Sequence, residues 1–488
     1  MIFPTPPFLL PLCLCASVAF FSSPSFSQDT IPAGGTWLHH MEHDLLRFWT
    51  TADALGEDTL GKFPLRMYHD GAGLPRHLRE HPEDRSFDGM KSSLGWVFPV
   101  LYSRQSYLYC VGYHLTGDPK LLVYAKTGID RYLKYCREQN GAFRFWIVNE
   151  DNPQAHSPNY DCVVNSYCLL APAMYYYLTR DPRMLWVLRQ GREFIFRTFT
   201  GNNPDWKTLA ATDDNMGQTG LGIMLDVVNA FMFLATPALV QPERTQWQND
   251  LKRLIDGIAG DLYDPKHHTF YNDMPRWSKP QTAPDYYSGG MDPKAFWYCY
   301  LFGNRYGDSS LVRFGLENGR IAEERFHIPE TGMWAANAFP DGSRDRISSY
   351  WCYNEMDQLL STLAIADPSY AKRLPLAYRR YFERFVDTLY GGVYHIVNDP
   401  GQPADRQLKG DHWKRDYHTS EHALVGYITS YAIRKQPVAL YYAFRDSVPD
   451  TSTITPCHYN GRISAVEDLG KMKETGLVKY RLTFEDVR

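Results

Sequence analysis

Hydrophobic side chains recur at helical spacing through most of the chain. Ten segments place apolar residues three or four positions apart, which is the spacing of a helix with one buried face. These segments are residues 37–49, 103–115, 119–137, 163–178, 220–234, 245–262, 294–302, 356–364, 376–389 and 419–433. The pattern predicts a mainly α fold with about ten to twelve helices.

A weak internal repeat arranges these helices in pairs. The stretch Tyr113–Leu122 resembles Tyr176–Leu185, 63 positions later, and shorter echoes occur at 306–311 and 366–370. In each copy a helix ends, a turn carries Asp-Pro or Gly-Asp, and a second helix begins. Asp can cap the new helix, and Pro fits its first turn. A period of about 60 residues predicts helical hairpins that close into an (α/α)6 toroid. The alternative, an open helical solenoid, requires clearer repeats.

The two ends of the chain differ from this pattern. Phe8–Phe21 is an apolar run of signal-peptide length, and Ser25-Phe26-Ser27 fits a small-x-small cleavage site. We therefore expect a signal peptide over 1–27, a secreted or periplasmic protein, and no later segment apolar enough to cross a membrane. Strand-like patterns at 437–444, 451–465 and 478–484 predict a small β-rich C-terminal extension over 436–488. The toroid then occupies 28–435, with short β-hairpins such as 391–397 at one mouth.

Composition narrows the class of protein. The chain is 44% hydrophobic and 22% charged with a formal charge of -4, which fits a globular protein and argues against nucleic-acid binding. Aromatic residues make up 15% of the chain, which fits either a large aromatic core or a cleft in which sugar rings stack on aromatic faces. The seven cysteines after residue 27 form no C-x-x-C pair, so we expect buried free thiols rather than a zinc ribbon.

The densest cluster of chemically active side chains lies at 409–422, where the last predicted helix begins. Thr419 or Ser420 can cap that helix, which places His418 at its positive end and favours neutral imidazole, the form that a general base needs. Glu421 and His422 follow within one turn. Three interpretations remain open: a capped helix with structural histidines, an inverted zinc-protease motif, and proton transfer on a sugar. The all-helical context does not fit the protease motif, and we expect no metal.

Three stretches resemble the N-acylglucosamine 2-epimerase family of sugar epimerases and isomerases, and together with the helical repeat they span roughly residues 36 to 435. The family's last hairpin has Lys-Gly, Trp-Lys and Tyr-His in this order. The matching residues are Lys409-Gly410, Trp413-Lys414 and Tyr417-His418, with further similarity at Ser103–Tyr107, which contains Arg104, and at Trp351–Gln358, which contains Glu355.

The resemblance implies a sugar isomerase or 2-epimerase that acts on a mono- or disaccharide without a cofactor. A base, here His418, removes the proton beside the carbonyl and leaves a cis-enediolate, whose oxygen Arg104 would stabilise. Glu355 would orient the site. The implied sugar-binding residues are Trp351, Trp413, Lys414, Glu421 and His422.

The sequence departs from the family at a second catalytic histidine. The family's Gly-His-x-x-Glu motif is absent, and the corresponding stretch is Gly290-Met-Asp292-Pro-Lys294. Another expected cavity histidine is also missing, and the stretch there is 215–220. Asp292 or Lys294 could take the role of the second base.

Two other functions remain possible on the same scaffold. A glycoside hydrolase or lyase would need two carboxylates on either side of the cleaved bond, drawn from Asp292, Glu355 and Glu421. A non-catalytic glycan-binding protein would bind sugars without turnover.

Overall fold

The computed structural model describes residues 30–83, 95–147, 150, 160–200, 220–271, 284–398, 402–403 and 408–488. The predicted signal peptide, and the stretch at 215–219 where a cavity histidine was expected, lie outside these residues. Most of the described chain is helical, as the periodicity predicts. Its helices are α1 (Gly34–His39), α2 (Leu46–Trp49), α3 (Ala52–Leu55), α4 (Leu74–Glu80), α5 (Pro99–Thr116), α6 (Pro119–Cys136), α7 (Cys162–Tyr167), α8 (Leu170–Thr179), α9 (Pro182–Thr200), α11 (Gly220–Val227), α12 (Phe233–Ala235), α13 (Glu243–Asp256), α14 (Met291–Tyr306), α15 (Ser309–Phe326), α16 (Tyr350–Ala366), α17 (Leu374–Arg384) and α18 (Tyr417–Ile433).

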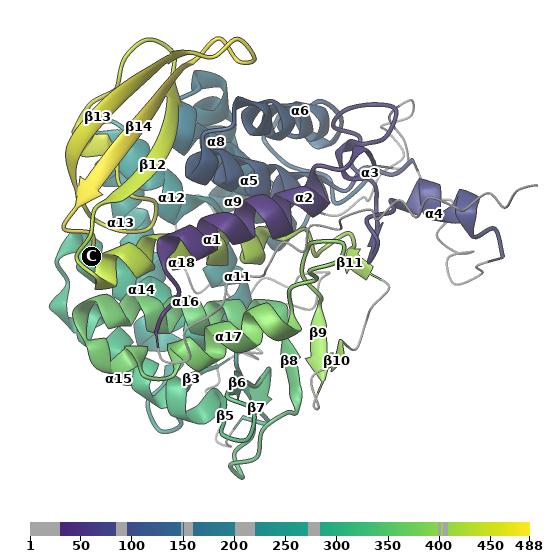
Figure 1. Ribbon diagram of the computed structural model, residues 1–488. Helices are drawn as coiled ribbons and strands as arrows, with labels where there is room; N and C mark the ends of the chain where they lie inside the picture. Colours follow the sequence, from purple (N-terminus) through teal and green to yellow (C-terminus); the bar gives the residue numbers. More distant parts are fainter. Residues whose placement is uncertain are drawn as a thin grey trace, which may run out of the picture.

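The helices form two concentric layers (Figure 1). The inner ring closes because each neighbour packs on the next, in the order α5, α7–α8, α11–α12, α14, α16, α18 and back to α5. The outer layer consists of α6, α9, α13, α15, α17 and the helix that runs through α1 and α2. Inner helices such as α5 and α18 are buried on nearly every side, whereas outer helices such as α6 and α15 bury one face only. The described helices thus confirm the (α/α)6 toroid.

The Asp-Pro and Gly-Asp turns work as the repeat predicts. A carboxylate oxygen of Asp118 accepts a hydrogen bond from the backbone N–H of Lys120 at the start of α6. Asp308 does the same for Ser310 at the start of α15. Each aspartate satisfies an N–H group that has no partner within its helix, so the repeat marks the points where inner helices turn into outer ones.

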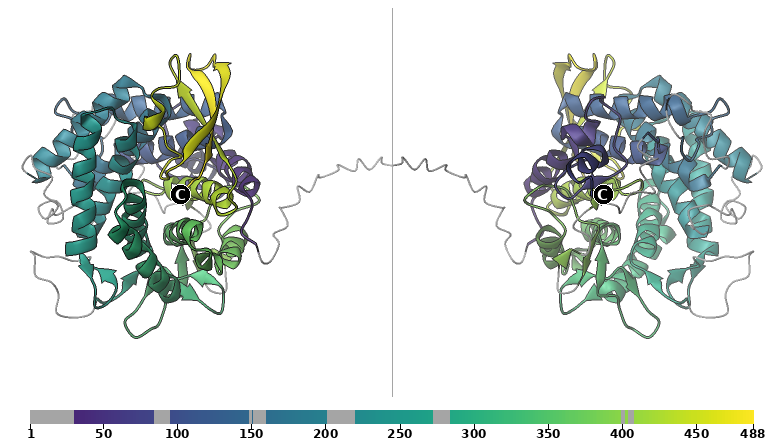
Figure 2. Two further views of the ribbon diagram at one scale, coloured as in Figure 1. Left: turned by 90° about the vertical axis from the view of Figure 1, so that its left-hand side faces the viewer. Right: turned by 90° about the vertical axis from the view of Figure 1, so that its right-hand side faces the viewer.

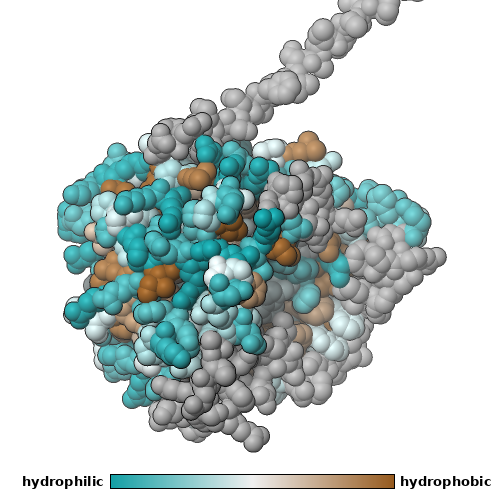
Figure 3. All heavy atoms as spheres, turned by 90° about the horizontal axis from the view of Figure 1, so that it is seen from below, coloured by the Kyte–Doolittle hydropathy of each residue, from teal (hydrophilic) through white to brown (hydrophobic). Residues whose placement is uncertain are grey.

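Short strands gather at the end of the toroid where the inner helices begin. They are β1 (Met67–Tyr68), β2 (Tyr263–Asp264), β3 (Thr269–Phe270), β4 (Tyr287–Ser288), β5 (His327–Ile328), β6 (Met333–Trp334), β7 (Asn337–Ala338), β8 (Ile347–Ser349), β9 (Ile396–Asn398), β10 (Gln402–Pro403) and β11 (Leu408–Gly410). The hairpin expected at 391–397 is realised only in part, because β9 begins at Ile396 and pairs with both β8 and β10. The visible part of the face seen from below is mostly hydrophilic, with small separated hydrophobic areas (Figure 3).

The C-terminal extension is an antiparallel sheet at the opposite end (Figure 2). Its strands β12 (Val438–Phe444), β14 (Val478–Glu485) and β13 (Arg462–Lys471) lie in that order. Strand β12 packs on α5 and α8. The predicted strand at 451–465 is wrong for most of its length, because strand β13 begins only at Arg462.

Residues 455–460, which we call the C-terminal plug, run across the ends of the inner helices. The backbone N–H of Cys457 donates to the Tyr177 hydroxyl of α8 at 2.8 Å, and the Cys457 carbonyl accepts from Arg305 of α14 at 2.9 Å. The Tyr459 hydroxyl lies 2.7 Å from Thr362 Oγ1 of α16. Because the side chains of the plug residues Cys457, His458 and Tyr459 are at most 2% exposed, the extension closes this end of the toroid.

The described cysteines are all free and buried, as expected. One expectation about apolar segments is wrong. The continuous helical stretch Gly220–Ala238 has a mean hydropathy of 1.6, so its length and composition would allow it to cross a membrane. It is completely buried inside the toroid, which is the setting of a core helix.

We predict that Tyr459→Ala lowers the free energy of unfolding by about 3–5 kcal/mol, because it leaves a cavity where a large aromatic side chain was buried. Urea unfolding measures the change. Val466→Ala, on the exposed strand β13, is the control and should shift stability by less than about 0.5 kcal/mol. Equal stabilities of the two variants would mean that the extension is a detachable appendage.

Candidate functional site

The helix that carries His418 begins two residues earlier than predicted. Asp416, rather than Thr419 or Ser420, precedes α18 and adopts a left-handed conformation with φ of 49°. Its carboxylate accepts hydrogen bonds from Trp49 Nε1 at 2.6 Å, from Lys414 Nζ at 2.7 Å and from Thr419 Oγ1 at 3.1 Å. These partners hold the carboxylate from three sides. His418 is consequently the second residue of α18, at its positive end, as the sequence predicts.

His418 is bonded to Glu355 of α16. Its Nδ1 lies 3.0 Å from Glu355 Oε1, and a neutral imidazole that donates from Nδ1 keeps a free lone pair on Nε2. Burial lowers the pKa of His418 to about 4, with Lys294 and Arg104 lowering it further and Glu355 opposing them. The imidazole is therefore neutral at physiological pH, as a general base must be. The sequence pointed to both residues, and the structure brings them together.

A lysine contacts the same carboxylate oxygen as His418. Lys294 Nζ of α14 lies 3.1 Å from Glu355 Oε1 and 3.3 Å from the Tyr417 hydroxyl. Burial favours a higher pKa for Glu355, but Lys294 and the hydrogen bond to His418 outweigh it and hold that pKa below its usual value. The Tyr417 hydroxyl in turn donates to Asn229 Oδ1 at 2.7 Å. Lys294, Glu355 and His418 thus form a buried triad.

Asp292, the other candidate for the missing histidine, points away from this triad. Its carboxylate accepts a hydrogen bond from the Thr269 hydroxyl at 2.6 Å and lies 3.9 Å from Arg325 of α15. Both partners belong to the outer layer and the short strands. The geometry therefore favours Lys294 over Asp292 as the group that meets a substrate.

Arg104 lies in the interior without a carboxylate partner among the described residues. Its guanidinium group lies against the rings of Tyr167 and Trp413, 4.1 Å and 3.9 Å from their centroids, and the two rings contact each other edge to face. The Nη1 of Arg104 donates a hydrogen bond to the Trp413 carbonyl at 2.7 Å. The buried Nε of Arg104 has no hydrogen-bond partner among the described residues. Two aromatic faces hold the cation in place, so its charge is available to a developing negative charge on a bound molecule.

Trp351 and Trp413, the two residues predicted to stack on a sugar, have different surroundings. The ring of Trp351 is partly exposed and lies 5.8 Å from the imidazole of His418. Any side chain at Gly290 would collide with the Trp351 ring, so glycine is required for this packing. One face of Trp413 is covered by Arg104. Trp351 is therefore better placed to stack on a sugar, and Trp413 to position the arginine.

Glu421 lies deeper in the interior, against the C-terminal plug. Its Oε1 accepts hydrogen bonds from the Tyr107 hydroxyl and from His458 Nε2, both at 3.3 Å, while the buried Oε2 has no partner. Burial lowers the pKa of His458, but Cys457 and Glu421 more than reverse this and raise it to about 9. No motif or periodicity pointed to His458, because it lies in an irregular segment of the extension.

Two residues predicted to bind sugar have other partners. Lys414 Nζ donates to the carbonyls of Val393 and Lys409 and to Asp416, all within 2.9 Å, which uses its three protons. This geometry assigns Lys414 to the framework of the loop. His422 Nε2 bonds to Asp357 at 3.1 Å, and its ring packs against Trp37 of the outer layer. His422 thus lies one turn further along α18 than His418 and contacts a different carboxylate of α16.

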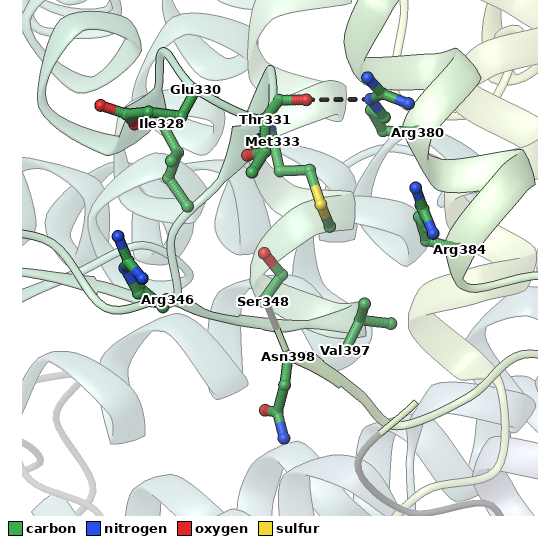
Figure 4. A pocket seen from close by; sticks show the side chains of 10 residues that line it. All are labelled: Ile328, Glu330, Thr331, Met333, Arg346, Ser348, Arg380, Arg384, Val397 and Asn398. Atoms are coloured by element: carbon green, nitrogen blue, oxygen red, sulfur yellow. Dashed lines mark hydrogen bonds between the residues drawn. The ribbon is translucent and has the colours of Figure 1, made fainter. Parts of the chain in front are cut away.

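No group of three His, Cys, Asp or Glu residues in the described part of the chain is placed to hold a metal ion. A separate cavity of about 210 Å³ lies between α17 and the strands β6, β8 and β9 (Figure 4). Arg346, Arg380 and Arg384 surround it, and Arg380 donates to the Thr331 carbonyl at 2.9 Å. It shares no residue with the buried triad and belongs to the outside of the toroid.

We expect the buried carboxyl of Asp292 to make the free energy of unfolding depend on pH. Burial raises its pKa to about 7 in the folded protein, against about 4 in an unfolded chain. Above pH 4 the unfolded chain releases the proton first, so stability falls as the pH rises from about 4 to about 7.

We expect Asp292→Asn to remove this slope and to unfold at higher denaturant concentration than the wild type at pH 8. The gain is at most about 4 kcal/mol and should vanish at pH 4. Denaturant unfolding at both pH values measures it, and an unchanged difference between the two proteins would contradict the assigned titration.

No family model matches the sequence, and no curated protein matches it. Several solved structures are similar to this protein in fold. A D-mannose isomerase matches with a TM-score of 0.65 and 14% identity over 81% of this chain and 98% of that chain. The cellobiose 2-epimerase of Bacillus thermoamylovorans B4167 gives 0.63 and 16% over 82% and 99%. An α-1,6-mannanase of Salegentibacter sp. HEL1_6 gives 0.52 and 11% over 80% and 99%. The chain therefore has the (α/α)6 toroid fold of the sugar isomerases and 2-epimerases, a fold that it shares with a glycoside hydrolase.

Proposed function

We propose that this protein is a sugar isomerase or 2-epimerase that moves a proton at the carbon beside the carbonyl of a mono- or disaccharide. The observation that carries the proposal is the neutral imidazole of His418, held by Glu355 and close enough to Arg104 for the guanidinium to lower its pKa. A base and a cation without a carboxylate partner in one buried cluster suit a reaction that creates a carbanion and delocalises its charge onto an oxygen, and the Arg104 guanidinium lies 5.5 Å from the ring of Tyr417, next to His418. The fold likeness to a D-mannose isomerase and a cellobiose 2-epimerase supports the choice of substrate class.

In the proposed reaction, His418 Nε2 takes the proton from carbon 2 of the open-chain aldose. The electron pair of that C–H bond forms the double bond between carbons 1 and 2, and the carbonyl oxygen becomes the oxyanion of a cis-enediolate. Arg104 stabilises this oxyanion, while Trp351 offers an aromatic face to the sugar. Return of a proton to carbon 1 gives the ketose, and its return to the opposite face of carbon 2 gives the epimer.

Glycoside hydrolysis fits the site less well. It needs a general acid whose pKa is raised so that it holds a proton near neutrality. The pKa of Glu355 is instead lowered by Lys294 and His418, and Asp292, whose pKa is raised, lies outside the interior cluster. The α-1,6-mannanase with this fold keeps hydrolysis as the second candidate.

We predict that the wild-type protein in D2O incorporates deuterium at carbon 2 of D-mannose, D-glucose or cellobiose, and that His418→Asn abolishes this exchange. Proton NMR follows the signal. Because the pKa of His418 is about 4, the exchange rate should fall only below about pH 4 rather than near 6.5.

The matched control is His114→Asn, since His114 is also a buried histidine of an inner helix. Its Nδ1 lies 2.9 Å from the Tyr441 carbonyl at the plugged end of α5, so exchange should persist in this variant. Absence of exchange with all three sugars in the wild type would reject the proposal, and release of sugars from a polysaccharide would then favour the hydrolase.

We also propose that the protein is exported, which is supported by the apolar run Phe8–Phe21 and the small residues before Gln28. Its substrate would then be met outside the cytoplasm. N-terminal sequencing of the protein secreted by an expressing cell should begin at or near Gln28, and a protein that keeps Met1 would contradict this.

A further inference from the structure

Lys294 has a position that simple neutralisation of Glu355 does not explain. Its ammonium group carries three protons, of which one goes to Glu355 and one to the Tyr417 hydroxyl. The third has no partner among the described residues. The side chain is only 3% exposed, so this proton remains inside the site and away from bulk water. An ammonium group with one uncommitted proton can donate that proton to a molecule bound in the interior.

A 2-epimerase needs such a donor. A single base held on one face of the sugar can return a proton only to the face from which it came, so inversion at carbon 2 requires a second group on the other face. Among the described interior groups, the hydroxyl of Tyr298 has no partner, but burial and the nearby carboxylates of Glu421 and Glu355 raise the pKa of Tyr298 well above its usual value. A phenol of that kind gives up its proton poorly, and Glu355 is held in its ionised form.

We propose that Lys294 is the second proton-transfer residue of this site, opposite His418, and that it makes the enzyme a 2-epimerase. This inference rests on the proposed isomerase or epimerase function. The two residues come from α14 and α18 and contact the same oxygen of Glu355, at 3.1 Å and 3.0 Å. The helices α14 and α18 pack on α16 from either side in the inner ring, so the two side chains reach Glu355 from different directions.

The proton balance closes without a cofactor. His418 takes the proton from carbon 2 and becomes an imidazolium, and the electron pair of the broken bond enters the enediolate. Lys294 gives a proton to the opposite face of carbon 2, the enediolate collapses to the carbonyl, and the lysine becomes a neutral amine. His418 has then gained one proton and Lys294 has lost one, and exchange of these protons with water after the product leaves restores the neutral imidazole and the ammonium group.

Lys294→Arg separates proton transfer from charge. Arginine keeps the positive charge beside Glu355, but it does not deprotonate in proteins and cannot cycle as an acid. With D-mannose in D2O, we expect this variant to retain deuterium exchange at carbon 2 of mannose through His418. Formation of D-glucose should fall by about 10²–10⁴-fold, the usual contribution of a general acid. A lysine that only neutralises Glu355 would leave the ratio of epimer to exchange unchanged.

A second variant keeps the test decisive if arginine does not fit. Lys294→Ala leaves room for a small amine, so added methylammonium should restore D-glucose formation in proportion to its concentration without changing the exchange rate. Asp292→Asn is the matched control on the same helix and should keep both rates within about threefold of wild type, since this carboxyl faces the outer layer. Thermal unfolding confirms that each variant is folded.

The outcomes separate the two proposals. Exchange in the wild type with epimer formation that survives in Lys294→Arg would overturn the role of Lys294 and leave the isomerase function intact. Exchange in the wild type with only the ketose as product would also overturn it. A wild type without exchange on D-mannose, D-glucose and cellobiose would remove the proposed function, and with it the role of Lys294.

Discussion

The burial of the Glu355 carboxylate is the constraint around which the interior is organised. A charged group taken out of water costs several kcal/mol unless partners compensate it. Glu355 is fully buried, and its partners come from three different parts of the sequence: Lys294 of α14, His418 of α18 and Gln358 of its own helix. Removing one partner would leave an unbalanced charge, so the three inner helices α14, α16 and α18 must meet in one arrangement. The same constraint fixes the tautomer of His418 and the position of the lysine ammonium.

The toroid allows a helical protein to hold such buried polar groups. An inner helix has no solvent-facing side, so its polar residues cannot reach bulk water and must find one another across the ring. Arg104, for example, is held by two aromatic faces and a carbonyl rather than by a carboxylate. The outer helices supply the ordinary amphipathic packing that stabilises the fold. The inner helices can therefore carry buried polar side chains that contribute little to the stability of the fold.

The sequence predicted the helices and the hairpin turns, because these depend on local patterns, whereas the roles of His418 and Glu355 were implied by the family resemblance. Asp118 and Asp308 cap the helices that follow them wherever the chain goes next. The position of Asp416 was not predictable in this way, since its left-handed conformation depends on Trp49, which is remote in the sequence. Choosing Lys294 over Asp292 required the direction of each side chain, because the two residues lie only two positions apart on α14. The contact of His458 with Glu421 joins an irregular segment to a helix. Hydrophobic periodicity does not predict such a contact.

The C-terminal plug has a consequence for the order in which this protein reaches its native state. Residues 455–460 contact helices from most of the ring, and they follow all of these helices in the chain. Contacts between residues far apart in the chain form slowly, because the loop between them must be closed first. The hairpins can assemble in sequence as the chain emerges, but the ends of the inner helices remain uncovered until the C-terminal plug docks. The segment that closes this end of the toroid is therefore made after every helix that it contacts, and until it docks the ends of the inner helices are exposed to aggregation.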